Sequence, residues 1–246
     1  MFRDFFLGLS APLRALRLLG SVSRLRRLAA MPFLINLLLF LVGVPLAVWG
    51  GVTFIGGLLP GAELLQGTLR VLLQVLIALA VIVGSAFAFT LVGNIIAAPF
   101  NSKLSEAVEE HVAGRPAAAA GGIVGDAVRG IITAIGRLFL FLLLYPLVFA
   151  LQFIPVAGPF LHAVFAALYG AFVLSIDFSD PTFERHFRRF RDKVGFIWGH
   201  RALYLGFGLT AVAMAIVPFV NFLLLPVCVT AAAMLYLEKR REELSG

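Results

Sequence analysis

Charged residues are scarce in this chain of 246 residues. Only 13% of the residues are Asp, Glu, Lys or Arg, whereas 61% are hydrophobic, and the mean hydropathy is +1.01. A soluble globular domain carries about 25% charged residues, so the composition excludes that class. The apolar runs are long and continuous rather than alternating in ten-residue segments, which favours helices as the membrane-spanning elements. The sequence therefore predicts an all-α integral membrane protein that forms one membrane domain.

Cysteine and catalytic motifs are equally sparse. Cys228, the only cysteine, lies inside an apolar run, which excludes an intramolecular disulfide and a cysteine metal cage. The histidines are scattered without metal-ligand spacing, at His111, His162, His186 and His200. The chain contains no P-loop, no nucleophile elbow and no zinc-protease helix. We therefore expect no enzymatic activity, no cofactor and no metal site.

The positive charge that is present gathers outside the apolar runs. The formal net charge of +7 matches an excess of Lys and Arg in cytoplasmic loops better than it matches nucleic-acid binding. Residues 33–55 and 69–93 are the two runs long enough to span, since residues 33–55 at about 1.5 Å each cover roughly 35 Å. The positive-inside rule then places both termini and residues 94–130 in the cytoplasm.

The cytoplasmic segment 94–130 is expected to begin where the second span ends. Asn94 follows a glycine, and Pro99 is predicted to stop any remaining helix. Asn101 can then cap a new helix, on which one apolar face is formed by Leu104, Val108 and Val112. The opposite face is charged, with Lys103, Glu106 and Glu110.

Two further apolar segments, 131–176 and 202–237, are each interrupted by proline with glycine or asparagine. The interruptions lie at 153–160 and 216–222, and neither carries a charge. The second segment is slightly short for two spans of about 20 residues plus a turn. Each segment is therefore predicted to be a broken helical hairpin that re-enters the membrane, and two complete spans are the alternative.

Two segments have the pattern of amphipathic helices lying at the membrane surface. In residues 2–20, an apolar stripe recurs at helical spacing and consists of Phe2, Phe6, Leu9, Leu13 and Leu16. Charged residues interrupt the run, namely Arg3, Asp4, Arg14 and Arg17. In residues 181–195, phenylalanines alternate with basic residues, and Asp180 is placed to cap the helix with Pro181 at its first position.

Arginines cluster just before the first span, at Arg24, Arg26 and Arg27. One interpretation is a topology anchor, because guanidinium groups belong in the headgroup region. The other is an anion site, because guanidinium provides paired donors that stay charged at any relevant pH, and we expect Arg26 and Arg27 to take part. Arg137 follows a short apolar stretch and is a candidate pathway residue, since charge within a membrane segment points to function.

Four sequence blocks resemble the CysZ family of bacterial sulfate permeases, within the etoposide-induced-protein superfamily. The blocks are Leu25–Asn36, Ile96–Asn101 with Glu106, Ser175–Pro181, and Ile216–Asn221 with Pro226. The resemblance implies a helical homo-oligomer in the bacterial inner membrane that imports sulfate for cysteine synthesis, with some helices only half-penetrating the bilayer. Separately from the resemblance, Asn36 and Asn94 are candidate pathway residues together with Arg137.

One departure from the family concerns the substrate site itself. Family members carry a Gly-Leu-Arg triplet associated with sulfate, and the matching triplet here is Arg24-Leu25-Arg26. Glycine permits a close backbone approach to an oxyanion, whereas arginine does not. The expected sulfate-binding residues are accordingly Arg24, Leu25, Arg26 and Arg27. The alternative function is a non-transporting structural protein that binds anionic lipid headgroups through its basic interfacial helices.

Overall fold

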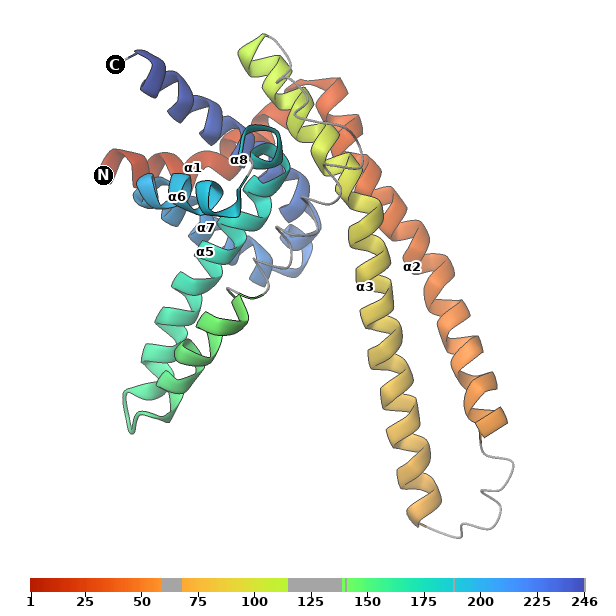
Figure 1. Ribbon diagram of the computed structural model, residues 1–246. Helices are drawn as coiled ribbons and strands as arrows, with labels where there is room; N and C mark the ends of the chain where they lie inside the picture. The colour runs from red at the N-terminus through yellow and green to blue at the C-terminus, as the bar shows by residue number, and fades with distance from the viewer. Residues whose placement is uncertain (59–67, 115–138, 140, 188, 246) are drawn as a thin grey trace. The chain divides into compact units, whose positions relative to one another are not determined.

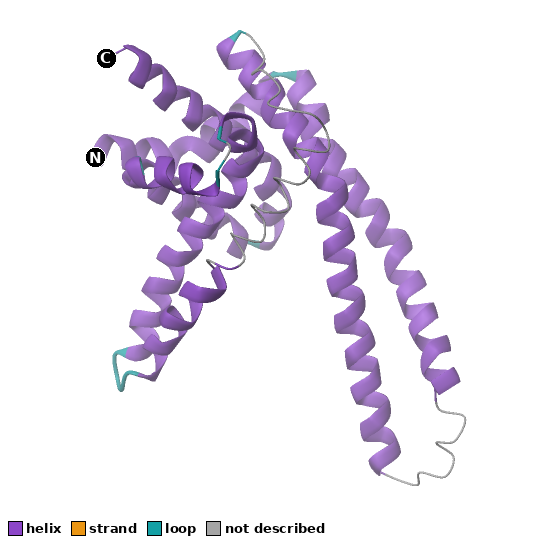
Figure 2. Ribbon diagram, in the orientation of Figure 1, coloured by secondary structure: helices purple, strands orange, loops and turns teal. Residues whose placement is uncertain are grey.

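The computed structural model describes residues 1–58, 68–114, 139, 141–187 and 189–245. All regular secondary structure in these residues is helical, which confirms the predicted all-α class (Figure 2). The elements follow one another as α1 (Phe2–Ser21), α2 (Ser23–Leu58), α3 (Thr68–Ala113), an apolar helix over Phe141–Phe153 that ends in the 3-10 turn η2 (Leu151–Phe153), α5 (Gly158–His186), α6 (Phe190–Gly199), α7 (Arg201–Ile216) and α8 (Pro218–Ser245) (Figure 1).

The chain divides into two compact units. Unit 1 consists of Met1–Ala29 and Asn101–Gly246, and unit 2 consists of Ala30–Phe100. Unit 2 therefore contains most of α2 and the N-terminal two thirds of α3. Unit 1 contains α1, the first turns of α2, the C-terminal turns of α3 and every later helix.

Unit 1 is organised around α7, which packs against α1 and α5. Both contacts depend on a glycine, because a Cβ atom at Gly206 would lie 2.2 Å from the Phe5 carbonyl oxygen and one at Gly208 would lie 2.0 Å from the Ala171 carbonyl oxygen. Small residues let helix backbones approach this closely. Helix α8 supplies the most continuous part of the core, a fully buried stretch from Val227 to Ala233.

Helix α1 confirms that residues 2–20 are helical, and it buries an unexpected face. Its small residues are buried, namely Ala11 and Ala15 at 0% exposure, whereas Phe2, Phe6, Leu13 and Leu16 of the predicted apolar stripe are exposed. The small face allows close contact with α7, and the large apolar side chains remain available to a membrane surface. The chain then bends by 108° into the first turns of α2.

Helices α2 and α3 are both longer than the predicted spans. Helix α2 begins at Ser23, so the arginine cluster is part of the helix. Helix α3 has 46 residues and passes through Asn94 and Pro99 without a break, so the expected helix end there is wrong. Proline removes one helical hydrogen bond, and this loss is outweighed here because the turns after Pro99 bury Leu104 and Val108 in unit 1. The helix ends before Gly114, whose φ is +74°.

Among the residues whose side chains the structure describes, α5 alone forms a continuous helix with the length and hydropathy of a membrane span. It has 29 residues, and only 17% of its most apolar window is buried inside the protein, so most of this surface is available to lipid. The first turns of α2 pass the same test only together with α1, as a bent pair. That residues 33–55 and 69–93 cross the bilayer stays a prediction.

Both predicted interruptions are present in the described residues. The helix over Phe141–Phe153 turns back at residues 154–157, and Val156 there has a φ of +64°. The Tyr169 hydroxyl of α5 donates to the Phe141 carbonyl oxygen at 2.9 Å, which ties the two arms of this hairpin together. The second interruption lies at Val217, between α7 and α8. Re-entrance into the membrane stays a prediction for both.

The predicted interfacial helix over 181–195 is divided in the structure. Helix α5 continues through Asp180 and Pro181 to His186, and α6 begins only at Phe190. Asp180 is therefore not a helix cap, and its carboxylate instead accepts a hydrogen bond from the Lys193 ammonium of α6 at 2.5 Å. Burial of Thr182 and Phe183 at 0% exposure holds the last turns of α5 in place beyond the proline.

Candidate anion groove and neighbouring charge clusters

An open groove in unit 1 has a volume of about 490 Å³ and lies between the start of α2 and the end of α3. We call it the basic groove. Its lining consists of Ser23, Arg24, Arg27, Leu28, Lys103, Glu106 and Ala107. Arg24 and Arg27 both line the groove because they are three residues apart on α2, so their side chains leave the same side of the helix.

Positive charge exceeds negative charge in the basic groove. Arg24 forms an ion pair with Glu110, in which the carboxylate lies 2.8 Å from the guanidinium. Both side chains of this pair are well exposed. Arg27 and Lys103 form no ion pair with any other described residue. Glu106 is the only carboxylate of the lining. The groove therefore offers two uncommitted cations, and a third that is partly neutralised.

The other expected site residues lie elsewhere. Leu25 is 1% exposed and belongs to the core of unit 1, so its side chain cannot reach a ligand in the basic groove. Arg26 donates from its guanidinium to the Gly20 carbonyl oxygen at 3.3 Å, near the end of α1. Asn36 and Asn94 lie in α2 and α3, but their side chains are outside what the structure describes, and Arg137 is outside the described residues altogether.

A second charged cluster, buried on the opposite side of the same α3 turns, was not expected from the sequence. Glu109 is 1% exposed and accepts hydrogen bonds from the Arg185 guanidinium and from His186 Nε2, the latter at 2.9 Å. Arg185 also donates to the Ser105 hydroxyl at 2.5 Å, and Ser105 lies 2.7 Å from the Thr182 hydroxyl. We call Glu109, Arg185, His186, Ser105 and Thr182 the buried cluster. It joins α3 to the end of α5.

The buried cluster shifts the ionisation of Glu109. Burial by itself would raise the pKa of this carboxyl group, but hydrogen bonds from His186 and Arg185 and the positive charge of Arg185 together lower the pKa below its ordinary value. Glu109 is therefore held as a carboxylate. One signal in the sequence indicated that Glu109 is buried, namely its position beside the apolar face of the helix, four residues after Ser105.

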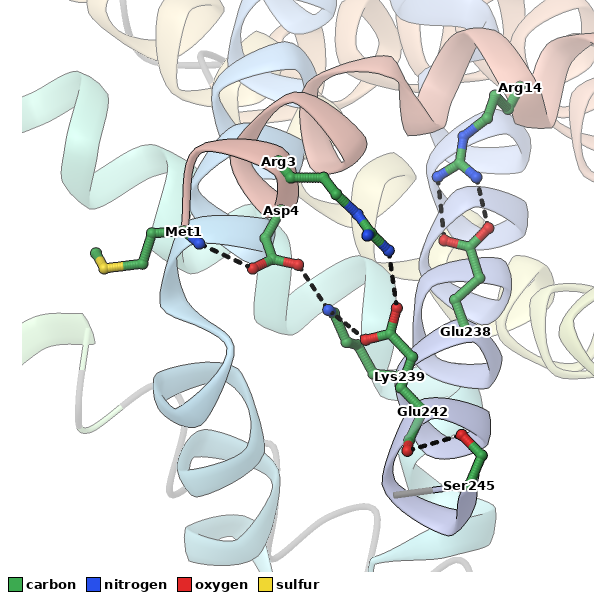
Figure 3. A network of polar contacts seen from close by, with 8 residues as sticks. All are labelled: Met1, Arg3, Asp4, Arg14, Glu238, Lys239, Glu242 and Ser245. Atoms are coloured by element: carbon green, nitrogen blue, oxygen red, sulfur yellow. Dashed lines mark hydrogen bonds and ion pairs between the residues drawn. The ribbon is translucent and has the colours of Figure 1, made fainter.

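A third set of charges fastens α1 to α8 (Figure 3). The Lys239 ammonium donates to Asp4 at 2.6 Å and to Glu242 at 2.7 Å, and Arg14 forms a two-pronged pair with Glu238. The hydrogen bond from Lys239 is the main reason that the pKa of Asp4 lies below its ordinary value. Each cation in these pairs already has a carboxylate partner, so the pairs hold α1 and α8 together and do not provide a site for a soluble anion.

The described residues thus form a helical protein with large exposed apolar surfaces, as membrane proteins have, and with a basic groove in unit 1. Residues 11–226 match the family of the sulfate transporter CysZ and etoposide-induced protein 2.4, and the chain belongs to this family. Its relatives over most of the chain are named as transporters and not as enzymes. This agrees with the resemblance seen in the sequence.

Relatives named sulfate transporter CysZ show how far the similarity extends. The one from Pseudomonas syringae pv. tomato is 30% identical over 219 residues, which is 88% of this chain and 86% of the relative. The one from Pseudomonas fluorescens is 30% identical over 227 residues, covering 89% and 88%. The one from Vibrio cholerae is 30% identical over 164 residues, or 65% of each chain.

Proposed function

We propose that this protein is a permease that imports sulfate across the bacterial inner membrane and so supplies cysteine biosynthesis. The observation that supports it most directly is the basic groove, in a chain whose relatives over nearly their full length are named sulfate transporters. We further propose that it acts as a homo-oligomer with both termini in the cytoplasm, as the charge distribution and the apolar surfaces of its helices suggest.

The groove has the chemistry that sulfate requires. Sulfate carries two negative charges and is strongly hydrated, so a site must replace its water with several donors at once. Arg27 and Lys103 provide charged donors without competing partners among the described residues, and Arg24 can turn from Glu110 toward a ligand because both side chains are exposed. The N-terminus of α2 begins at the groove, and its first backbone N–H groups add a favourable dipole for an anion.

Glu106 is expected to oppose sulfate from the other wall of the groove. A carboxylate beside three cations lowers the net positive charge, which weakens binding and speeds release. A permease must release its ion as well as bind it, so a partly neutralised site suits transport better than the tightest one. Arg26, although adjacent in sequence to Arg27, does not line the groove and instead donates a hydrogen bond near the end of α1.

Radiolabelled sulfate uptake into vesicles that contain only this protein tests the proposal. The wild-type protein should accumulate sulfate above empty vesicles, and the Arg24→Ala, Arg27→Ala double variant should lose binding by about 1.5–3 kcal/mol for each charge-assisted hydrogen bond removed. Arg27→Lys should restore binding in part, because a point charge cannot reproduce the planar fork of guanidinium. Glu106→Gln should bind sulfate more tightly.

The control is Arg240→Ala, since Arg240 is an exposed arginine that pairs with Glu243 on α8, away from the groove lining. It should transport as the wild type does. Sulfate uptake equal to that of empty vesicles in the folded wild-type protein would reject the permease function and favour the structural, lipid-binding alternative. Unchanged sulfate affinity in the double variant would leave a permease whose site lies elsewhere.

A further inference from the structure

A second hollow in unit 1 lies away from the basic groove, among α1, α5, α6 and α7. Its volume is about 780 Å³, within the range of about 300–1,000 Å³ that small-molecule sites occupy. Its walls are almost entirely apolar, with Phe2, Phe5, Leu168, Phe172, Trp198 and Leu205. Buried Ile197 and Tyr204 also line it. We call this hollow the apolar groove.

A small polar pocket adjoins one end of the apolar groove. Its volume is about 260 Å³, and it shares Met1, Trp198, Arg201 and Ala202 with the apolar groove. The pocket adds polar groups, among them Asp4, His200 and Lys239. Together the two hollows form one amphipathic site, in which an apolar compartment leads into a charged one.

Arg201 is the uncommitted charge where the two compartments meet. Lys239 is already neutralised by Asp4 and Glu242, and His200 lies 3.7 Å from Glu243. Arg201, in contrast, is exposed and forms no ion pair with any other described residue. The junction therefore has a guanidinium group with room for an anion.

The position of Arg201 on its helix gives it no stabilising role there. It is the first residue of α7, and a cation at a helix N-terminus opposes the dipole of that helix. An anion bound at the same point would reverse this sign, because the first N–H groups of α7 and the guanidinium would then act together. The N-terminus of α7 and Arg201 therefore both favour an anionic group at this point.

We propose that this amphipathic site binds one anionic phospholipid of the surrounding bilayer, with an acyl chain in the apolar groove and the phosphate at Arg201. A water-soluble anion would leave the apolar groove unfilled, and a lipid without net negative charge, such as phosphatidylcholine, would leave the positive charge of Arg201 uncompensated because its choline cation offsets its phosphate. Trp198, 63% exposed at the shared rim, and the exposed phenylalanines of α1 are the side chains expected at the level of lipid headgroups. The site is separate from the basic groove and does not depend on the sulfate proposal.

Native mass spectrometry of the purified full-length protein, titrated with phosphatidylglycerol or phosphatidylcholine, tests this assignment. The wild-type protein should bind one phosphatidylglycerol per chain, and more tightly than phosphatidylcholine. Arg201→Ala should weaken phosphatidylglycerol binding about tenfold or more, the loss expected for a charge-assisted hydrogen bond, and should remove the preference between the two lipids. Leu168→Trp should fill the apolar groove and weaken binding of both lipids.

Control variants outside the site test whether the loss of lipid binding is specific to Arg201 and Leu168. Arg191→Ala removes an exposed arginine of α6 that does not line the site, and Leu147→Trp enlarges an exposed leucine elsewhere; both should bind lipid as the wild type does. Arg201→Gln repeats the charge removal with a longer polar side chain in case the alanine variant is poorly folded. Glycerol 3-phosphate should compete weakly, because it lacks the acyl chain.

Three outcomes would overturn the proposal. Equal phosphatidylglycerol affinity in folded wild-type protein and both Arg201 variants would remove the headgroup site. Full competition by glycerol 3-phosphate would show a site for soluble anions instead of a lipid. A change of oligomeric mass in Leu168→Trp, with lipid binding unaltered, would show that a second copy of the chain covers the groove.

Discussion

The same turns of α3 carry two clusters of charge with opposite surroundings. On one side, Glu109 is enclosed by Arg185, His186 and hydroxyl groups, and it is almost inaccessible to solvent. On the other side, Lys103 and Glu106 face the open basic groove with arginines of α2. Burial makes a charge expensive unless every partner is in place, whereas exposure leaves it free to exchange partners. The first cluster is therefore suited to holding helices together, and the second to binding and releasing an ion.

Among the expected effects, the loss of stability on removal of Glu109 should be the largest, and it should distinguish the buried cluster from the basic groove. Glu109→Ala leaves Arg185 and His186 without their carboxylate, and breaking a buried pair in this way costs about 3–5 kcal/mol. Thermal unfolding in mild detergent measures the loss. Glu106→Ala is the matched control, because an exposed glutamate of the same helix should change the free energy of unfolding by no more than about 0.5 kcal/mol. Equal destabilisation by the two variants would contradict the contrast between the clusters.

Acidification should weaken the buried cluster in a more graded way. The pKa of Glu109 is lower in the folded protein than its ordinary value of 4.5, so the unfolded chain binds the proton first as the pH falls. The stability that Glu109 contributes is thus fully present above 4.5 and is lost as the pH falls through the lowered folded pKa. Asp4, with its pKa lowered by Lys239, acts in the same direction.

The comparison of wild-type protein with Glu109→Gln isolates this contribution. The amide cannot titrate, so the melting temperature of Glu109→Gln should fall less steeply with decreasing pH than that of the wild type. Parallel pH profiles for the two proteins would show that Glu109 does not contribute to acid sensitivity.

The smallest effect is expected for the ion pair at the edge of the basic groove. The side chains of Arg24 and Glu110 are 66% and 41% exposed, and such pairs contribute between about 0 and 1 kcal/mol. A double-mutant cycle of Arg24→Ala and Glu110→Ala should give a coupling free energy in this range. A larger coupling would mean that Arg24 is committed to Glu110 and is not available to sulfate.

The sequence predicted those features that depend on neighbours along the chain. The apolar face of Leu104 and Val108 is buried as expected, and the interruptions near Pro155 and Pro218 fall where proline and the absence of charge indicated them. Helix boundaries were predicted less well, namely the helix end at Asn94 and the helix start at Pro181, because a proline breaks a helix only when later residues gain nothing by continuing it. In both places the next turns bury side chains in unit 1.

Composition and charge by themselves determined that this is a helical protein with membrane character, and the order of its sequence blocks determined the family. Only the tertiary structure decided which charges are buried and which are open. Glu109 and Arg185 are 76 residues apart, and Arg14 and Glu238 are 224 apart, so no local pattern could pair them. The same holds for the arginine cluster: the sequence placed three guanidinium groups together, but helix α2 turns Arg24 and Arg27 toward the groove and Arg26 toward the end of α1. Helical periodicity distributes adjacent side chains to different faces, and only packing against α1 and α3 determines what each face meets.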